Sequence, residues 1–163
     1  MENKVLISPS AVAKYFLVKA REDGELISPL KMQKLVYYAY AWFLVKKNER
    51  LFDEGIQAWP NGPVIPSLYQ ELKKYGSNPI NSEEFTGIDS QVNSDKFIAT
   101  IPEEILSVLD EVYSKYMVFT PFELVMLTHS EKPWNEARKG LLASQHTTKV
   151  IGDKDILEQY KTV

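Results

Sequence analysis

The side chains best suited to proton transfer or metal binding are the two histidines, His129 and His146. They are separated by seventeen positions, a spacing that does not place two ligands on one face of a helix. A metal site or an acid–base centre would therefore need carboxylates brought in by the fold. We interpret His129 as a structural histidine that joins the end of a helix to the next loop, with a catalytic role as the alternative. His146 lies in a polar loop, where we expect it to be solvated.

Other catalytic arrangements are missing from the sequence. The chain has no cysteine, which excludes thiolate nucleophiles, disulfides and cysteine-based metal sites. No serine has the flanking glycines of a strained nucleophile elbow, and the seven glycines do not form a phosphate-binding cluster. The acidic pairs Glu83-Glu84 and Glu103-Glu104 are neighbours that point apart on a helix, which is typical of a solvated face. The sequence therefore predicts a protein without catalytic activity, cofactor or bound metal.

The tryptophans carry more information about binding. Trp59 precedes the sequence Pro60-Asn61-Gly62-Pro63, and Trp134 follows Pro133. An aromatic side chain held beside a rigid turn can anchor a partner protein. It can equally cover the core of its own domain, and both interpretations stay open for these two residues. Trp42 lies inside an apolar run, and we assign it to the core.

Helices must position most of these residues. Ser8-Pro9-Ser10 predicts the start of a first helix, which ends before Gly24. Ser28 and Pro29 begin a second helix over Leu30–Lys47, whose middle is apolar almost all round. In a soluble protein such a helix is buried at the centre of the fold. Its tyrosines and tryptophan then need hydrogen-bond partners.

The remaining pattern predicts short elements around that central helix. We expect a strand at 56–59, an interruption of regular structure at 60–63, and a helix from Pro66 to Gly76. We also expect a mobile acidic loop over 77–100 with a short strand at 97–99. Further helices are predicted from Pro102 to Tyr116, from a capping box at Thr120 and Glu123 to Thr128, over 132–138, and over 156–160 after an Asp153 cap. The predicted fold is mainly α (α+β), one domain over 1–163 with five to seven helices and two or three short strands.

Composition and charge limit the functional classes. Hydrophobic residues make up 44% of the 163 positions, enough to form a sizeable core. The longest apolar run, Leu35–Val45, is shorter than the roughly 20 residues that span a bilayer, so we expect a cytoplasmic protein without a membrane partner. The net charge of −3 argues against nucleic-acid binding. Residues 76–104 contain one lysine against six acidic residues, so that segment is locally negative.

The order of these pieces resembles the Panacea domain, also described as the SocA-like antitoxin family, over roughly Ala11 to Tyr160. The run Lys31–Ala39 with Ala41-Trp42 is similar to the central helix motif of the family. Leu51–Glu54 and Ile56–Trp59 match its strand region, and Asn61–Tyr69 matches its turn and following helix start. Leu127–Glu131 with Pro133-Trp134 matches its C-terminal pattern. The motif residues taken from this resemblance are Leu35, Tyr38, Trp42, Phe52, Gly62, Pro63, Val64, Thr128 and His129.

One position departs from the family pattern. The resemblance leads us to expect an aromatic residue, usually tyrosine, before Gly62-Pro63, and this chain has Asn61. Asparagine tolerates the backbone angles of a tight turn, so we expect the fold to be kept. A partner contact made by that aromatic ring would be lost.

The resemblance implies an antitoxin that neutralises a toxin protein, usually encoded beside it, by direct complex formation. One domain type pairs with many unrelated toxins, so the sequence names neither the toxin nor the oligomeric state. A proteolytic adaptor, or a phage-encoded interaction module that delivers a partner to host protease machinery, is the alternative; an autoregulator and an enzyme using His129 are weaker ones. The residues predicted to contact the partner are Trp59, Asn61, Tyr69, Glu83, Glu84, Asp89 and Trp134.

Overall fold

Helix α2 (Pro29–Lys47) is the buried axis of the protein. We describe residues 6–161 of a computed structural model, in which the Ser28 hydroxyl caps the helix by accepting from the Lys31 amide. The helix ends at Asn48, whose left-handed backbone (φ 54°) terminates it. Its middle is buried all round, as the apolar run predicts, and it packs against α1, α3, α6, α7, α9 and β2. The predicted central helix is therefore confirmed.

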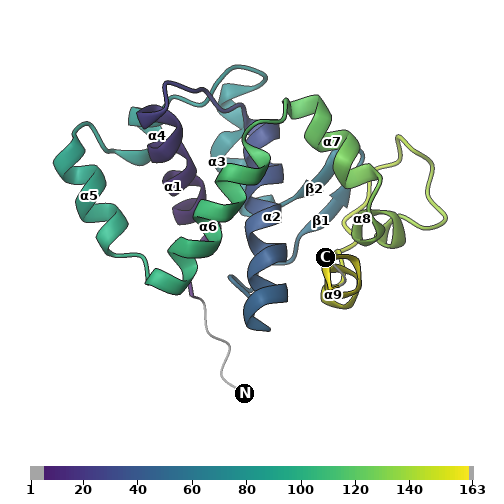
Figure 1. Ribbon diagram of the computed structural model, residues 1–163. Coiled ribbons are helices and arrows are strands. Elements are labelled where there is room, and N and C mark those ends of the chain that lie inside the picture. The colour runs from purple at the N-terminus through teal and green to yellow at the C-terminus, as the bar shows by residue number, and fades with distance from the viewer. Residues whose placement is uncertain (1–5, 162–163) are drawn as a thin grey trace.

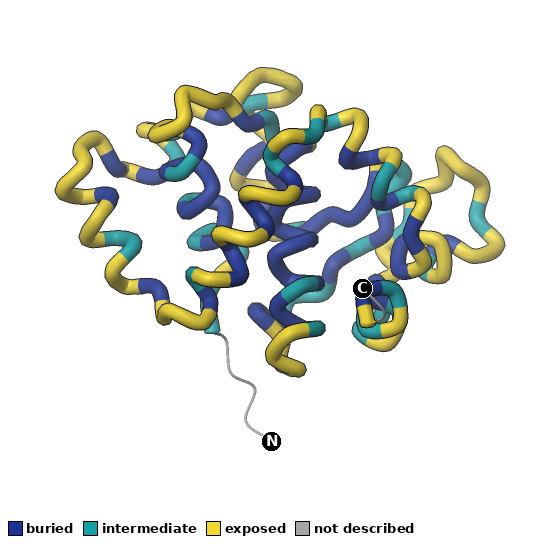
Figure 2. Tube along the Cα trace, viewed as in Figure 1, coloured by how far each residue is buried: buried dark blue, intermediate teal, exposed yellow. Residues whose placement is uncertain are grey.

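The other elements surround this axis on two sides. Figure 1 shows α1, α4 and α5 on one side of α2, and the two strands with α7, α8 and α9 on the other. Figure 2 shows burial concentrated along α2 and the faces turned toward it, while the outer faces of the surrounding helices are exposed. The remaining helices are α1 (Pro9–Glu22), α3 (Pro66–Leu72), the 3₁₀ turn η1 (Lys73–Tyr75), α4 (Ser82–Thr86), α5 (Gln91–Ala99), α6 (Glu103–Tyr116), α7 (Pro121–His129), α8 (Lys132–Ala137) and α9 (Asp153–Tyr160).

The mainly α (α+β) class is confirmed, although residues 6–161 contain nine α-helices rather than five to seven. The predicted capping box is present, because the Thr120 hydroxyl accepts from the Glu123 amide while the Glu123 carboxylate accepts from the Thr120 amide. The cap predicted at Asp153 is wrong by one position. Gly152 is the cap and Asp153 is already helical.

Two short strands form a hairpin between α2 and α3. Strand β1 (Gln57–Trp59) pairs antiparallel with β2 (Gly62–Val64), and Pro60 and Asn61 form the two-residue turn. The predicted interruption of regular structure over 60–63 is therefore wrong for Gly62 and Pro63, because these two residues belong to strand β2. The left-handed angle of the turn region falls on Gly62 (φ 109°) and not on Asn61.

The segment 77–100 is not the loop that we predicted. It contains α4 and α5, and the strand expected at 97–99 is the last turn of α5. Its Asn and Ser residues indicated a loop, but Asn81 and Ser90 act as N-caps that accept from the amides of Glu84 and Asn93. Phe97 and Ile98, on the same segment, pack against the core. The mobility of this segment remains a prediction.

Candidate functional site

The hairpin is fixed to α2 by two polar side chains in the first turns of the helix, directly before its apolar middle. The Gln33 amide forms two hydrogen bonds with Ile65, which follows β2: its Nε2 donates to the Ile65 carbonyl (3.2 Å) and its Oε1 accepts from the Ile65 amide (2.8 Å). At the next residue, the Lys34 ammonium donates to the Pro63 carbonyl (3.1 Å). Both side chains are buried. The motif on α2 and the motif around Gly62-Pro63 therefore form one structural unit.

Gly62 is required by this close approach. A Cβ atom at this position would lie 2.6 Å from Lys34 Cε and 2.9 Å from Thr128 Oγ1. Its backbone φ of 109° is also an angle that residues other than glycine rarely adopt. The Gly62 position thus brings the hairpin, α2 and α7 into direct contact.

Helix α8 holds the hairpin from the opposite side. The Trp134 indole donates to the Trp59 carbonyl (2.8 Å), and Arg138 Nη1 donates to the Ala58 carbonyl (2.7 Å). Arg138 Nη2 donates to the carbonyls of Leu142 and Gln145, which orders the loop after α8. Trp134 is buried, so the structure favours the interpretation that it covers the core over the one that it anchors a partner.

His129 packs in the same cluster. Its ring stacks on Trp134 with a centroid separation of 3.8 Å, and its Nε2 is buried without a hydrogen-bond partner in the described part of the chain. Burial lowers the pKa of His129, and the nearby charges of Lys34 and Arg138 lower it further. These contacts match a structural histidine. No group of three or more His, Asp or Glu side chains within residues 6–161 could hold a metal ion.

A second polar centre lies between α2, α8 and α9. The hydroxyls of Tyr38 and Tyr160 both donate to Glu131 Oε1, at 2.7 and 2.8 Å. Burial raises the pKa of Glu131, whereas these two hydrogen bonds act in the opposite direction. Tyr40 donates to Asp153 and Trp42 to Tyr116, so the polar ends of these α2 aromatics have the partners that we predicted they need.

An apolar cleft opens beside the hairpin. It has a volume of about 330 Å³ and lies between the first turns of α2, the hairpin turn and α3. Trp59, Asn61 and Tyr69, three of the predicted partner residues, line it, and the Trp59 and Tyr69 rings meet edge to face at 4.9 Å. His146 is exposed, as we expected, and its ring meets the Trp59 ring edge to face with the two centroids 5.3 Å apart.

The acidic residues predicted to contact a partner lie elsewhere, on α4 and just before α5. Glu83 and Asp89 are exposed. The Glu84 carboxylate accepts from Lys74 (2.7 Å) and from the Tyr75 hydroxyl (2.6 Å), so part of its charge is compensated within the chain. The structure thus separates the predicted partner residues into an aromatic group on the hairpin and α3 and an acidic group on α4.

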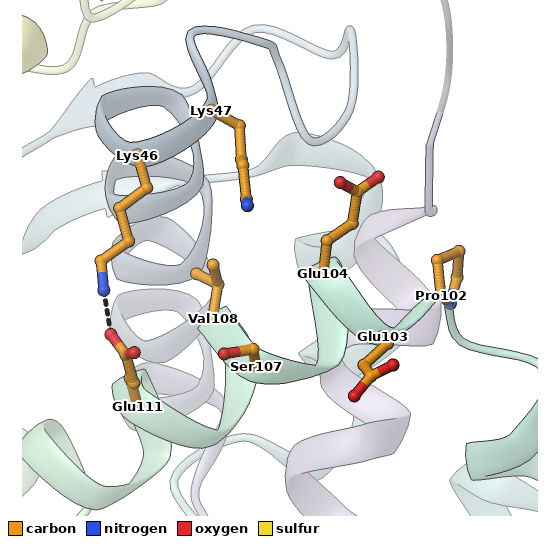
Figure 3. A pocket seen from close by; sticks show the side chains of 8 residues that line it. All are labelled: Lys46, Lys47, Pro102, Glu103, Glu104, Ser107, Val108 and Glu111. Atoms are coloured by element: carbon orange, nitrogen blue, oxygen red, sulfur yellow. Dashed lines mark hydrogen bonds and ion pairs between the residues drawn. The ribbon is translucent and has the colours of Figure 1, made fainter.

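A larger but shallow groove lies at the other end of α2. Figure 3 shows Lys46 and Lys47 on α2 facing Glu104 and Glu111 on α6, with Lys46 and Glu111 paired across it. It contains none of the residues predicted to contact a partner. No helix within residues 6–161 is long and apolar enough to span a membrane.

The sequence analysis did not single out Gln33, Lys34, Glu131 or Arg138, although each makes buried hydrogen bonds in this region. The usable signal was the polar pair Gln33-Lys34 directly before the apolar run Leu35–Val45. Polar side chains at such positions are buried only where a partner group satisfies them. That partner is a backbone segment some thirty positions away, which the local pattern does not reveal.

Comparison with known proteins places the chain in a family. A family model described as "Antitoxin SocA-like, Panacea domain" matches residues 32–135, which include α2, the hairpin and α8 up to Asn135. The protein named Antitoxin SocA of Caulobacter vibrioides (strain NA1000 / CB15N) is 28% identical over 159 residues, covering 95% of this chain and 83% of that protein. No solved structure matches significantly. The chain therefore belongs to the SocA-like antitoxin family that is built on the Panacea domain.

Proposed function

We propose that this protein is an antitoxin that neutralises a cognate toxin protein by binding it directly. Membership of the SocA-like family and the likeness to Antitoxin SocA support an antitoxin role. The observation that carries direct binding is the cleft lined by Trp59, Asn61 and Tyr69. Tyr69 is 40% exposed, and aromatic residues held in a concave surface are the usual anchors of protein interfaces.

The rigidity of this surface favours binding. Backbone atoms of the hairpin are held by Gln33 and Lys34 from α2 and by Trp134 and Arg138 from α8. A partner that contacts the hairpin turn therefore does not have to order it first, which lowers the entropic cost of association. Asn61 lies exposed at the tip of the turn, where the family pattern expects an aromatic residue. We therefore expect the toxin to contact the polar Asn61 side chain at the tip of the turn, beside the aromatic rings of Trp59 and Tyr69.

Growth rescue with the adjacent gene tests this function. The neighbouring reading frame is induced with and without this chain, and the two proteins are then purified together. We expect growth arrest by the neighbour alone, rescue by co-expression, and a stable complex. Trp59→Ala with Tyr69→Ala is expected to abolish the rescue while the variant stays folded. A harmless neighbour, or rescue without any complex, contradicts the proposal.

The same cells distinguish masking from delivery to a protease. An antitoxin that masks its toxin leaves the amount of toxin unchanged, whereas a proteolytic adaptor lowers it. Immunoblotting of the tagged toxin after translation is stopped measures this directly. We expect an unchanged or longer toxin half-life. A half-life that shortens only when this chain is present would replace direct masking with the adaptor function.

A further inference from the structure

Lys34 differs from the other buried charges within residues 6–161. Lys31 also donates to a single carbonyl, that of Met117, but the charges of Glu25 and Glu123 favour its charged form. Arg138 donates to several backbone carbonyls, and the Glu131 carboxylate accepts from two tyrosines. Lys34 is fully buried, and the Pro63 carbonyl is the one acceptor for its three donors within residues 6–161. None of the carboxylates in this range forms an ion pair with it. A buried ammonium without a counter-ion is costly, so this arrangement needs a reason.

The cleft beside Lys34 has an unusual charge. Among residues 6–161, Lys34 and Lys73 line it and no acidic side chain does, in a protein whose net charge is −3. Four other cavities within residues 6–161, the groove of Figure 3 among them, are each lined by at least one Asp or Glu. The rest of the lining is mainly apolar or aromatic, including Leu30, Trp59 and Tyr69. Charge complementarity therefore favours a ligand group that is anionic and flanked by apolar atoms.

We infer that this cleft receives an acidic side chain of the bound toxin, flanked by apolar residues, and that its carboxylate pairs with the Lys34 ammonium. This inference rests on the proposed function, because the toxin supplies the carboxylate. The apolar walls exclude water from the pair, which strengthens it relative to an ion pair in solvent. The flanking apolar residues of the toxin pack against Trp59, Tyr69 and Leu30.

The protonation of Lys34 supplies a signature of this contact. Burial lowers the pKa of Lys34 to about 7. His129 on α7 is influenced by the charges of both Lys34 and Arg138, and Lys73 of η1 lines the same cleft. None of these three basic groups is a counter-ion for Lys34, whose pKa is lowered by burial. A carboxylate in the cleft favours the charged form of Lys34, so binding above neutral pH takes up a proton.

Matched methionine variants test the inference. Lys34→Met removes the charge at similar length, and Lys73→Met does the same at the exposed edge of the cleft. Calorimetric titration with the purified toxin is expected to show at least a roughly tenfold loss of affinity for Lys34→Met and less than a threefold loss for Lys73→Met. Thermal unfolding checks that both variants fold. An affinity of Lys34→Met within threefold of the parent overturns the inference and leaves the antitoxin function intact.

Proton uptake distinguishes a contact with the carboxylate from a merely structural role of Lys34. Titrations at pH 8 in phosphate and in Tris, which differ in ionisation enthalpy, are expected to report uptake of about one proton for the parent chain. The Lys34→Met variant is expected to take up none. Equal heats in both buffers for the parent chain contradict the contact.

A toxin-free probe keeps the two proposals separate. The parent chain is titrated with 3-phenylpropionate and with 3-phenylpropionamide while the Trp59 indole signal is followed by NMR. Binding of the acid and not of the amide, lost in Lys34→Met, supports the carboxylate site. Equal behaviour of acid and amide overturns it. A parent chain that fails to bind the toxin, in contrast, contradicts the proposed function and leaves this probe to decide the chemistry of the cleft.

Discussion

The β1–β2 hairpin and the α4–α5 segment are both short insertions beside the central helices, but they are held in different ways. Hydrogen bonds from buried side chains of α2 and α8 reach the hairpin backbone at Ala58, Trp59, Pro63 and Ile65. In contrast, α5 buries one residue, Ser94. Arg21 reaches the Ile88 carbonyl (2.8 Å) and Lys14 lies over the Phe97 ring (5.2 Å), and both connect the segment to α1.

This difference bears on where a partner binds. Segments with few buried apolar contacts open more easily than segments held by the core. The hairpin therefore offers a preorganised surface, whereas the α4–α5 segment offers exposed charge on α4, followed by a helix, α5, that buries one residue. Preorganised aromatic surfaces determine affinity, and exposed charges mainly affect the association rate. We expect the hairpin cleft to determine how tightly a toxin is held and the acidic group to affect how fast it arrives.

The largest effect is expected at the point where the hairpin touches α2. Gly62→Ala places a Cβ 2.6 Å from Lys34 Cε at a φ of 109°. The combined strain and overlap should lower the free energy of unfolding by about 3 kcal/mol. Gly87→Ala, at the end of α4, is the control: its φ is 69° and no atom lies within 4 Å of the added Cβ. It should cost about 1 kcal/mol. Urea denaturation measures the free energy of unfolding of both variants. Equal losses of stability in the two variants would contradict the prediction that the hairpin is held more tightly than the end of α4.

The next effect concerns the hydrogen bonds of the hairpin. Gln33→Leu keeps the approximate volume and leaves the buried Ile65 amide without its partner, whereas the Ile65 carbonyl still accepts from the Tyr69 amide. We expect a loss of about 1 to 3 kcal/mol, the cost of one unsatisfied buried polar group. Gln91→Leu on α5 removes an exposed bond to Asp95 and should stay within about 0.5 kcal/mol. Comparable effects of the two substitutions would show that Gln33 does not hold the hairpin.

The same contrast explains which parts of the structure the sequence predicts. Strong local signals found α2 from its apolar run and α7 from its Thr120–Glu123 capping box. The weakly amphipathic α5 was missed, because its caps are polar and its contacts are few. At the site, Trp59 was singled out as an aromatic residue beside a rigid turn, and Tyr69 as a predicted partner residue. Lys34 was not, since its role depends on a carbonyl at Pro63 that only the tertiary fold brings near.

A pH dependence of stability should come from Lys34. Burial lowers its pKa in the folded chain to about 7, while an unfolded lysine keeps its proton to about pH 10.4. Between these two pKa values the unfolded chain binds more protons than the folded chain, so the free energy of unfolding rises with pH. This gain in stability is lost as the pH falls toward 7. We expect a rise of about 2 kcal/mol from pH 7 to pH 9. Urea denaturation should show this rise for the parent chain and Lys73→Met, and a flat profile for Lys34→Met. A flat profile in the parent chain would mean that Lys34 stays charged.

The smallest effect is expected from the acidic group on α4. Glu83 is exposed and forms no side-chain ion pair in the structure, whereas Glu84 is already bonded to Lys74 and Tyr75. Glu83→Lys should slow association with the toxin by about two- to threefold at low salt, because exposed charges at the edge of an interface act mainly on the association rate. The dissociation rate and the stability should not change.

Glu49→Lys, at another exposed carboxylate just after α2, reverses the same charge away from α4 and is the matched control. Stopped-flow association at two ionic strengths separates the local contribution of Glu83 from the change in net charge. If Glu83→Lys and Glu49→Lys slow association equally, the effect belongs to the whole protein and α4 does not face the toxin. If Glu83→Lys instead raises the dissociation rate, α4 lies inside the interface and helps to determine how tightly the toxin is held. The division of roles between the hairpin and α4 would then be wrong, because a charge outside the interface acts mainly on the association rate.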